Sequence, residues 1–196
     1  TIDLSSLIPK LSFDHFSNAL AALQDWLNAE KSMSEDISKW ILTCLTESSK
    51  TRPTDKWLGA SKVQLKGIEE ASLVKGLSNI MLGAAADFKA LHKADLPPHL
   101  RYGLQVPDWL SCVAWFAGFH LGQHTEIRMA IDQLASAGLK KYPGIGPLGG
   151  KIGNACLRAF SLMPGMEGIS ALFRYKNKAI NRNVIKLTET LLNEAA

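Results

Sequence analysis

The sequence lacks the long apolar run that a membrane-spanning helix requires. Its longest nearly apolar stretch covers residues 109–122 and is interrupted by Ser111 and His120, whereas a spanning helix needs about 20 apolar residues. The first residues, Thr1 to Leu4, also lack the basic stretch and apolar run of a signal peptide. We therefore expect no membrane segment, and the absence of an initial Met predicts a fragment or a processed start.

Cysteine is scarce, with only Cys44, Cys112 and Cys156 among 196 residues. No two of them have the spacing of a zinc motif or of a Cys-x-x-Cys redox pair. An odd number of widely separated cysteines is typical of a reducing compartment, so we expect a cytoplasmic protein with three buried thiols. The hydrophobic fraction of 46% and the charged fraction of 20% are those of an ordinary globular chain, which excludes a disordered tail.

Strand patterns are nearly absent, because we find neither alternating β-branched runs nor an Asn-Gly or Asp-Gly hairpin turn. Apolar residues instead recur every three or four positions, which is the period of a helix. This spacing predicts helices over residues 13–30, 35–48, 73–91, 126–137, 151–162, 166–175 and 179–194, a short helix starting at Pro53-Thr54, and a nearly all-apolar central helix opening at Pro107.

Several residues predict where these helices begin and end. Ser12 and Ser34 are expected N-caps, since a Ser hydroxyl can accept a hydrogen bond from the first helical turn. Gly138 is expected to stop the helix over 126–137, and Pro97-Pro98 is expected to end the long helix before it.

A weak repeat of period 38 aligns Ala130, Ile131 and Leu134 with Gly168, Ile169 and Leu172. This period is close to that of HEAT-type helix pairs, which bury their apolar faces only by stacking on neighbours. We therefore predict an all-α fold of antiparallel helix pairs, stacked as a HEAT-like right-handed solenoid or as an irregular multi-helix bundle. We expect an N-terminal helical region over 1–96 and HEAT-like pairs over 97–196, or one continuous domain over 1–196.

Eight of the 15 glycines lie between Gly138 and Gly168, around the segment Tyr142-Pro-Gly-Ile-Gly-Pro-Leu-Gly-Gly-Lys151. A dinucleotide-binding G-x-G-x-x-G motif requires a preceding strand, and none is predicted. A phosphate-binding G-x-x-x-x-G-K loop fails because residue 145 is Ile. The remaining interpretation from geometry is that Gly144 and Gly146 permit a positive φ in a tight turn, while Gly149, Gly150 and Gly153 let the next helix pack closely.

Nucleic-acid binding is the alternative for the same segment. Pro-Gly-Ile-Gly between two helices is similar to the turn of a DNA-binding helix-hairpin-helix, whose backbone N–H groups bind phosphate. Nine Lys and Arg but only three Glu lie after residue 138, whereas residues 1–138 contain 13 basic and 15 acidic residues. The predicted partner or nucleic-acid contacts are Lys140, Lys141, Gly144, Gly146, Lys151 and Arg158.

A family resemblance covers residues 142–196. The segments Gly144-Ile-Gly-Pro147, Lys151-Ile-Gly-Asn-Ala-Cys156, Met163-Pro-Gly165 and Gly168-Ile-x-x-Leu-Phe-Arg174 resemble the helical-repeat region of large bacterial MolR-type proteins, which are often associated with a WGR domain. The resemblance implies a HEAT-like all-helical fold and transfers no catalytic residue. It also implies that the chain is part of a larger bacterial protein of unestablished function.

No pattern points firmly to an enzyme. His120 and His124 are four residues apart and could share a helix face, with Glu126 or Asp132 as a third metal ligand. The segment lacks the Glu that a His-Glu-x-x-His protease motif requires, and no serine lies in a nucleophile elbow. Ordinary helix-end histidines are the commoner explanation, so we predict no catalytic residue, no cofactor and no metal.

The sequence therefore predicts a non-catalytic interaction scaffold whose partner and oligomeric state are not encoded in any motif. Stacked helices create a groove, and aromatic side chains in a groove are typical binding anchors. Trp26, Trp40 and Trp57 lie on amphipathic helices that could leave an edge of the ring exposed, although packing in the core is the commoner role of such residues. Trp109 and Trp115 belong to the apolar central helix and are expected in the core.

Overall fold

The computed structural model describes residues 4–196. In this part of the chain the regular structure is almost entirely helical, and the only strands are the two-residue segments β1 (Lys141–Tyr142) and β2 (Gly146–Pro147). The helices are α1 (Leu4–Leu11), α2 (Ser17–Ala29), α3 (Ser34–Glu47), α4 (Asp55–Gln64), α5 (Glu70–Lys93), α6 (Pro98–Gly103), α7 (Leu110–Leu121), α8 (Thr125–Leu139), α9 (Gly150–Leu162), α10 (Glu167–Lys178) and α11 (Arg182–Ala195), with a short 3-10 helix, η1 (Lys31–Met33). The predicted all-α class is confirmed. The expectation of no signal peptide concerns residues 1–3, which lie outside the described residues.

The helix starts follow local chemistry in some places and tertiary contacts in others. Thr54 caps α4, because its side-chain oxygen accepts a hydrogen bond from the backbone N–H of Trp57 at 3.2 Å. The two serine caps predicted from the sequence are wrong. The Ser12 hydroxyl donates to the Ile8 carbonyl at the end of α1, and Ser34 is already the first residue of α3, with its hydroxyl bonded to a carbonyl three residues back.

Helix α2 begins at a carboxylate supplied by α5. The nearly fully buried Asp87 accepts hydrogen bonds from the backbone N–H groups of Asn18 and Ala19, at 3.3 and 3.1 Å, and from the Asn18 side-chain amide at 2.8 Å. Burial raises the pKa of Asp87, while these hydrogen bonds act in the opposite direction. Gly83 allows this approach, because a Cβ there would lie 2.7 Å from the Asn18 carbonyl oxygen.

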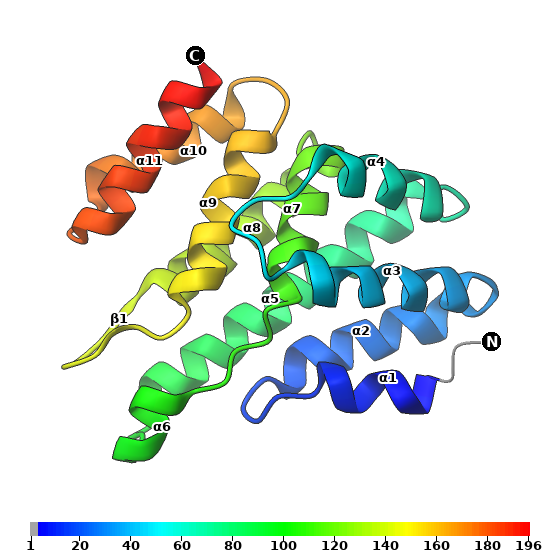
Figure 1. The fold of residues 1–196 in the computed structure, drawn as a ribbon, viewed down its shortest axis with the longest axis horizontal. Helices are drawn as coiled ribbons and strands as arrows, with labels where there is room; N and C mark the ends of the chain where they lie inside the picture. The colour runs from blue at the N-terminus through cyan, green and yellow to red at the C-terminus, as the bar shows by residue number, and fades with distance from the viewer. Residues whose placement is uncertain (1–3) are drawn as a thin grey trace.

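The helices follow one another across the molecule, with α1 and α11 on opposite sides (Figure 1). Helix α2 packs on α5, α5 packs on α8, and both α7 and α8 pack on α9. Helix α9 in turn contacts α10 and α11, while α3 and α4 cover α7. The buried hydrophobic residues form one cluster that extends across residue 97, so α5 from the first predicted region and α8 from the second share a core.

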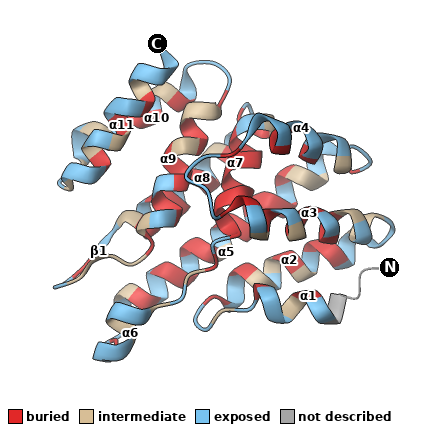
Figure 2. Ribbon diagram, viewed as in Figure 1, coloured by how far each residue is buried: buried red, intermediate tan, exposed pale blue. Residues whose placement is uncertain are grey.

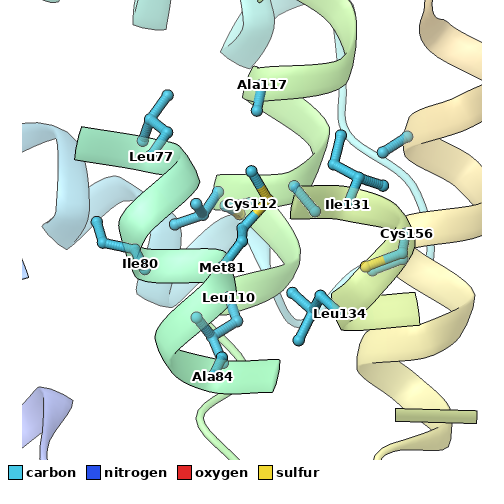
Figure 3. Packing of buried hydrophobic residues seen from close by; sticks show 14 of the residues in the cluster. Leu77, Ile80, Met81, Ala84, Leu110, Cys112, Ala117, Ile131, Leu134 and Cys156 are labelled. Atoms are coloured by element: carbon cyan, nitrogen blue, oxygen red, sulfur yellow. The ribbon is translucent and has the colours of Figure 1, made fainter. Parts of the chain in front are cut away.

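Helix α7 lies in the centre of this core, as its apolar sequence predicts. Every residue from Leu110 to Gly118 is buried, and the helix is the one most completely buried in Figure 2. Side chains of α5, α8 and α9 pack against those of α7, and Met81 of α5, Cys112 of α7 and Leu134 of α8 are among them (Figure 3). All three cysteines are buried and unpaired, as expected.

The tryptophans do not provide exposed binding anchors. Trp26, Trp40 and Trp57 are only 4%, 0% and 8% exposed, so the core role, the commoner of the two interpretations, is confirmed and the alternative of exposed ring edges is wrong. The indole N–H of Trp26 donates to the Ser72 hydroxyl and that of Trp57 to the Thr43 hydroxyl. These hydrogen bonds satisfy the polar edges of Trp26 and Trp57 and allow burial that helical periodicity alone does not predict. The indole N–H of Trp40 is buried without a hydrogen-bond partner.

Several helix boundaries also differ from the predictions. Helix α7 begins at Leu110, after a turn in which the Leu110 N–H bonds to the Pro107 carbonyl, and not at Pro107 itself. Helix α8 continues through Gly138 to Leu139, because Gly138 serves helix packing and a Cβ there would lie 2.9 Å from the Gly149 carbonyl oxygen. Pro98 occupies the first position of α6 rather than only ending the preceding helix. A proline is tolerated at that position because the first helical N–H groups have no intrahelical partner. Helices α1 and α6 and the 3-10 helix η1 were not predicted from the apolar spacing.

Candidate functional site

The glycine-rich segment forms a short hairpin between α8 and α9. Strands β1 and β2 pair antiparallel, with Tyr142 opposite Gly146. Gly144 and Gly146 have φ values of +78° and +106°, so the predicted need for glycine in this turn is confirmed. The segment is therefore not the direct helix-to-helix turn of a helix-hairpin-helix, because β1 and β2 separate the end of α8 from the start of α9.

The base of the hairpin is fixed to the end of α5. The Tyr142 hydroxyl donates to the Ala94 carbonyl at 2.9 Å and accepts from the Leu96 N–H at 3.1 Å. Close packing is confirmed for Gly149 and Gly153, where a Cβ would lie 2.4 Å from the Phe88 ring and 2.4 Å from the Leu139 side chain, respectively. The nearest atom to a Cβ on Gly150 is 3.8 Å away, so packing does not require glycine there.

The structure divides the predicted contact residues among different surfaces. Lys140 and Lys141 lie together at the end of α8 and the start of the hairpin. Lys151 forms an ion pair with Asp108 at 2.8 Å, and Arg158 forms one with Glu194 at 2.5 Å. Gly144 and Gly146 occupy the hairpin turn. The six residues therefore do not form one site, and two of the four predicted cations are neutralised within the protein.

A pocket of about 580 Å³ lies beside Lys140 and Lys141, between α8, α10 and the start of α11. Its lining residues are Asp132, Ser136, Leu139, Lys140, Lys141, Arg174, Tyr175, Lys178, Ala179, Ile180, Asn181 and Val184. We call it the basic pocket. Its volume is in the range of ordinary ligand sites.

Three cations of the basic pocket are not neutralised by the protein. Lys140, Lys141 and Lys178 are exposed, and none has a carboxylate within 4.0 Å among the described residues. Arg174, in contrast, is paired with Asp132 at 3.2 Å. The pocket therefore has a net positive charge at neutral pH.

The remaining wall of the basic pocket is apolar. Leu139 comes from α8, Ala179 and Ile180 from the link between α10 and α11, and Val184 from α11. Ile180 is 87% exposed, the highest value among the large hydrophobic side chains of the described residues. A largely exposed Ile beside three unpaired lysines combines apolar and electrostatic attraction in one concave surface.

A hydrogen-bonded group holds α8 and α10 together beside the pocket. The Tyr175 hydroxyl lies 2.9 Å from the Asp132 carboxylate and 2.9 Å from the Ser136 hydroxyl. Because a phenol has one hydrogen, Tyr175 donates to the carboxylate and accepts from Ser136. Burial raises the pKa of Tyr175, and the neighbouring Asp132 raises it further, so the phenol is a neutral donor at physiological pH.

Sequence reasoning counted Arg174 and Lys178 among the nine basic residues after residue 138 but predicted neither as a contact, and it did not single out Tyr175. Arg174 and Lys178 are four residues apart, so their common helix face could have been recognised from the sequence. The position of α10 against α8 could not, because it depends on the tertiary contact between Tyr175 and Asp132.

The two candidate metal-ligating histidines have different partners. The ring Nε2 of His120 lies 2.9 Å from the Leu58 carbonyl oxygen, and that of His124 lies beside a Glu70 carboxylate oxygen. Burial lowers the pKa of His120, which favours its neutral form. Within residues 4–196, no group of three or more His, Cys, Asp and Glu side chains is placed to hold a metal ion.

Two further grooves lie on either side of α5. One, of about 730 Å³, lies between α2 and α5, and the other, of about 610 Å³, lies between α5 and α8. They meet at Lys75, Asn79 and Leu82, which line both grooves. We call them the α5 grooves. Together, the basic pocket and the two α5 grooves form three hollows along the helices α2, α5, α8 and α10.

None of the described helices combines the length and the apolar character needed to cross a membrane. Comparisons of the chain with models of protein families, with curated proteins and with solved structures find no match.

Proposed function

We propose that this protein is a non-catalytic interaction scaffold that binds a protein partner along the helices α2, α5, α8 and α10. The observation that carries the proposal is the series of hollows between these helices, the two α5 grooves and the basic pocket. Stacked helices create such extended surfaces, and each hollow adds contact area for the same partner. No catalytic role is assigned to any residue.

Packing of α7–α8 against α9–α10 supports an arrangement of stacked helix pairs. Helix α7 contacts α9, and α8 is joined to α10 through Asp132 and Tyr175. The repeat of period 38 relates residues of α8 to residues of α10, and Leu134 and Leu172 are both fully buried. These features favour the HEAT-like solenoid over the irregular bundle and agree with the resemblance to MolR-type proteins, on which we propose that the chain is part of a larger bacterial protein.

Exposed apolar side chains favour a protein as the partner. Leu82 and Met129 line the groove between α5 and α8 and are 36% and 58% exposed. Methionine and leucine at a surface groove adapt to the side chains of a protein partner, whereas phosphate groups gain nothing from them. The three buried, unpaired cysteines favour a reducing compartment such as the cytoplasm.

Site-specific photo-crosslinking tests the proposal. A photoreactive amino acid replaces Asn79, which is exposed between the two α5 grooves, and in a matched control it replaces Lys56, which is exposed on α4. In a lysate of the source organism we expect a discrete protease-sensitive adduct from position 79 only. The adduct should disappear when Leu82→Glu and Met129→Glu are added, and thermal melting of the double variant verifies that its fold is intact.

Three results would contradict the proposal: no adduct from position 79, equal adducts from both positions, or persistence of the adduct in the double variant. A nuclease-sensitive adduct would instead support the nucleic-acid alternative. That alternative also predicts that affinity for a short DNA decreases steeply with added salt, because phosphate contacts release counterions.

A further inference from the structure

We infer that the basic pocket binds an acidic peptide segment that carries a bulky apolar side chain. The inference deepens the proposed scaffold function, because it names the chemistry of the partner at one end of the binding surface. It rests on the combination of unpaired cations and an apolar wall in the same concavity.

The charge of the pocket selects an anion. Lys140, Lys141 and Lys178 converge on it from the end of α8, from β1 and from the end of α10. The Asp132 carboxylate is already bound by Arg174 and Tyr175. Two or three carboxylates of a ligand could therefore pair with lysines without displacing any ion pair of the protein.

The apolar wall distinguishes a peptide from a nucleic acid. Leu139, Val184 and the 87% exposed Ile180 provide a surface against which a Leu or Phe side chain loses its contact with water. A nucleic-acid backbone has no such group, and nucleotide bases stack on aromatic rings, whereas the ring of Tyr175 is partly buried beside Phe160 and its hydroxyl is hydrogen-bonded to α8.

The two walls of the pocket formed by α8 and α10 are held together by hydrogen bonds. The Tyr175 hydroxyl joins Asp132 and Ser136 of α8, and Arg174 reinforces the same contact. A preorganised wall reduces the entropy that binding must overcome. We therefore expect the peptide to bind without rearrangement of α8 or α10.

Fluorescence polarisation with a labelled peptide of sequence Asp-Glu-Leu-Phe-Asp-Glu tests the inference. Two control peptides separate the contributions: Asn-Gln-Leu-Phe-Asn-Gln removes the charges, and Asp-Glu-Ala-Ala-Asp-Glu removes the apolar anchors. We expect saturable binding of the first peptide at low ionic strength, and at least about fivefold weaker binding of each control, which corresponds to loss of one or two of these contacts.

The variant Lys140→Glu with Lys178→Glu should weaken binding of the acidic peptide by about tenfold or more. Its matched control is Lys56→Glu with Lys66→Glu, which makes the same change in net charge at two exposed lysines outside the basic pocket. The control should bind like the unmodified protein. Both variants replace exposed side chains, and unchanged circular dichroism and melting temperature verify their folds.

The inference is overturned if the acidic peptide does not bind, if the uncharged or the alanine peptide binds as tightly, or if the two double variants bind equally. It is also overturned if a short oligothymidylate or laurate binds in the pocket more tightly than the peptide, because the occupant is then a nucleic acid or an acyl anion. If the acidic peptide does not bind but the crosslinked adduct from position 79 forms, only the assignment of the peptide to the basic pocket is rejected. Peptide binding without that adduct rejects the extended scaffold and leaves the pocket.

Discussion

Replacement of Gly118 by Ala tests whether α7 and α9 pack as closely as the structure indicates. A Cβ at position 118 would lie 2.5 Å from the backbone oxygen of Ala159, whereas ordinary contact begins at 3.4 Å. The obstacle is backbone, which no side-chain rotation can remove. The two helices must therefore separate locally by about 0.9 Å, and a gap of that size forfeits about a quarter to a half of the contact attraction of each atom pair.

The magnitude follows from two opposing contributions. Ala is favoured over Gly in a helix by about 0.5–1 kcal/mol, while overpacking a core costs about 1–3 kcal/mol and more against rigid backbone. We expect Gly118→Ala to lower the free energy of unfolding by about 2 kcal/mol and the melting temperature by about 4–8 °C.

Gly59→Ala is the matched control. Gly59 lies in α4, and nothing lies within 4 Å of a Cβ at that position. Only the helix preference remains, so this variant should gain about 0.5–1 kcal/mol and about 1–4 °C. Urea unfolding and thermal melting measure both variants. If Gly118→Ala is as stabilising as Gly59→Ala, the close contact between α7 and α9 does not exist.

Three further predictions follow from buried groups. Asp87→Ala should lower the free energy of unfolding by about 2–4 kcal/mol, because the start of α2 loses its hydrogen-bond acceptor. The control Asp25→Ala, at an exposed residue, should change the free energy of unfolding by less than about 0.5 kcal/mol. Equal effects of the two variants in urea unfolding would contradict the capping role of Asp87. Burial lowers the pKa of His120 from its ordinary value of 6.5, so its contribution to the free energy of unfolding is present above pH 6.5 and is lost as the pH falls through the folded value. In His120→Gln, whose amide can still donate to the Leu58 carbonyl, the free energy of unfolding should depend less on pH between neutral and mildly acidic conditions. An unchanged pH profile would refute the assignment. Burial also raises the pKa of Cys44 and Cys156, so Ellman's reagent should react with the thiols only after denaturation, and rapid reaction of the native protein would contradict their placement.

Helical periodicity predicted most of the fold because each helix buries one face. The stripe from Leu77 to Leu91 and the apolar sequence of α7 correspond to buried helices in the structure. The start of α2 was not predictable from Ser12, because α2 is capped by Asp87, which lies 69 residues after Asn18. At α3, Ser34 is the first helical residue and its hydroxyl bonds to the Lys31 carbonyl, so it does not act as the N-cap. Local capping rules do not contain such a long-range contact.

The sequence predicted some residues of the candidate site but not their arrangement in space. The excess of Lys and Arg over Glu after residue 138 indicated contacts at Lys140 and Lys141, and both residues line the basic pocket. The same asymmetry could not reveal that Lys151 is neutralised by Asp108, which lies 43 residues earlier. Nor could it place Lys178 in the same pocket as Lys140, because that placement depends on the hydrogen bonds of Tyr175 to Asp132 and Ser136 of α8.

The most direct test of the account is nuclear magnetic resonance on the isotope-labelled chain titrated with the peptide Asp-Glu-Leu-Phe-Asp-Glu. We predict that the amide signals that move belong to the walls of the basic pocket, at Ser136, Leu139 to Lys141, and Arg174 to Val184. Signals of the hairpin turn at Gly144 and of α4 should stay in place. Shifts confined to the hairpin turn, or no shifts at all, would contradict the account.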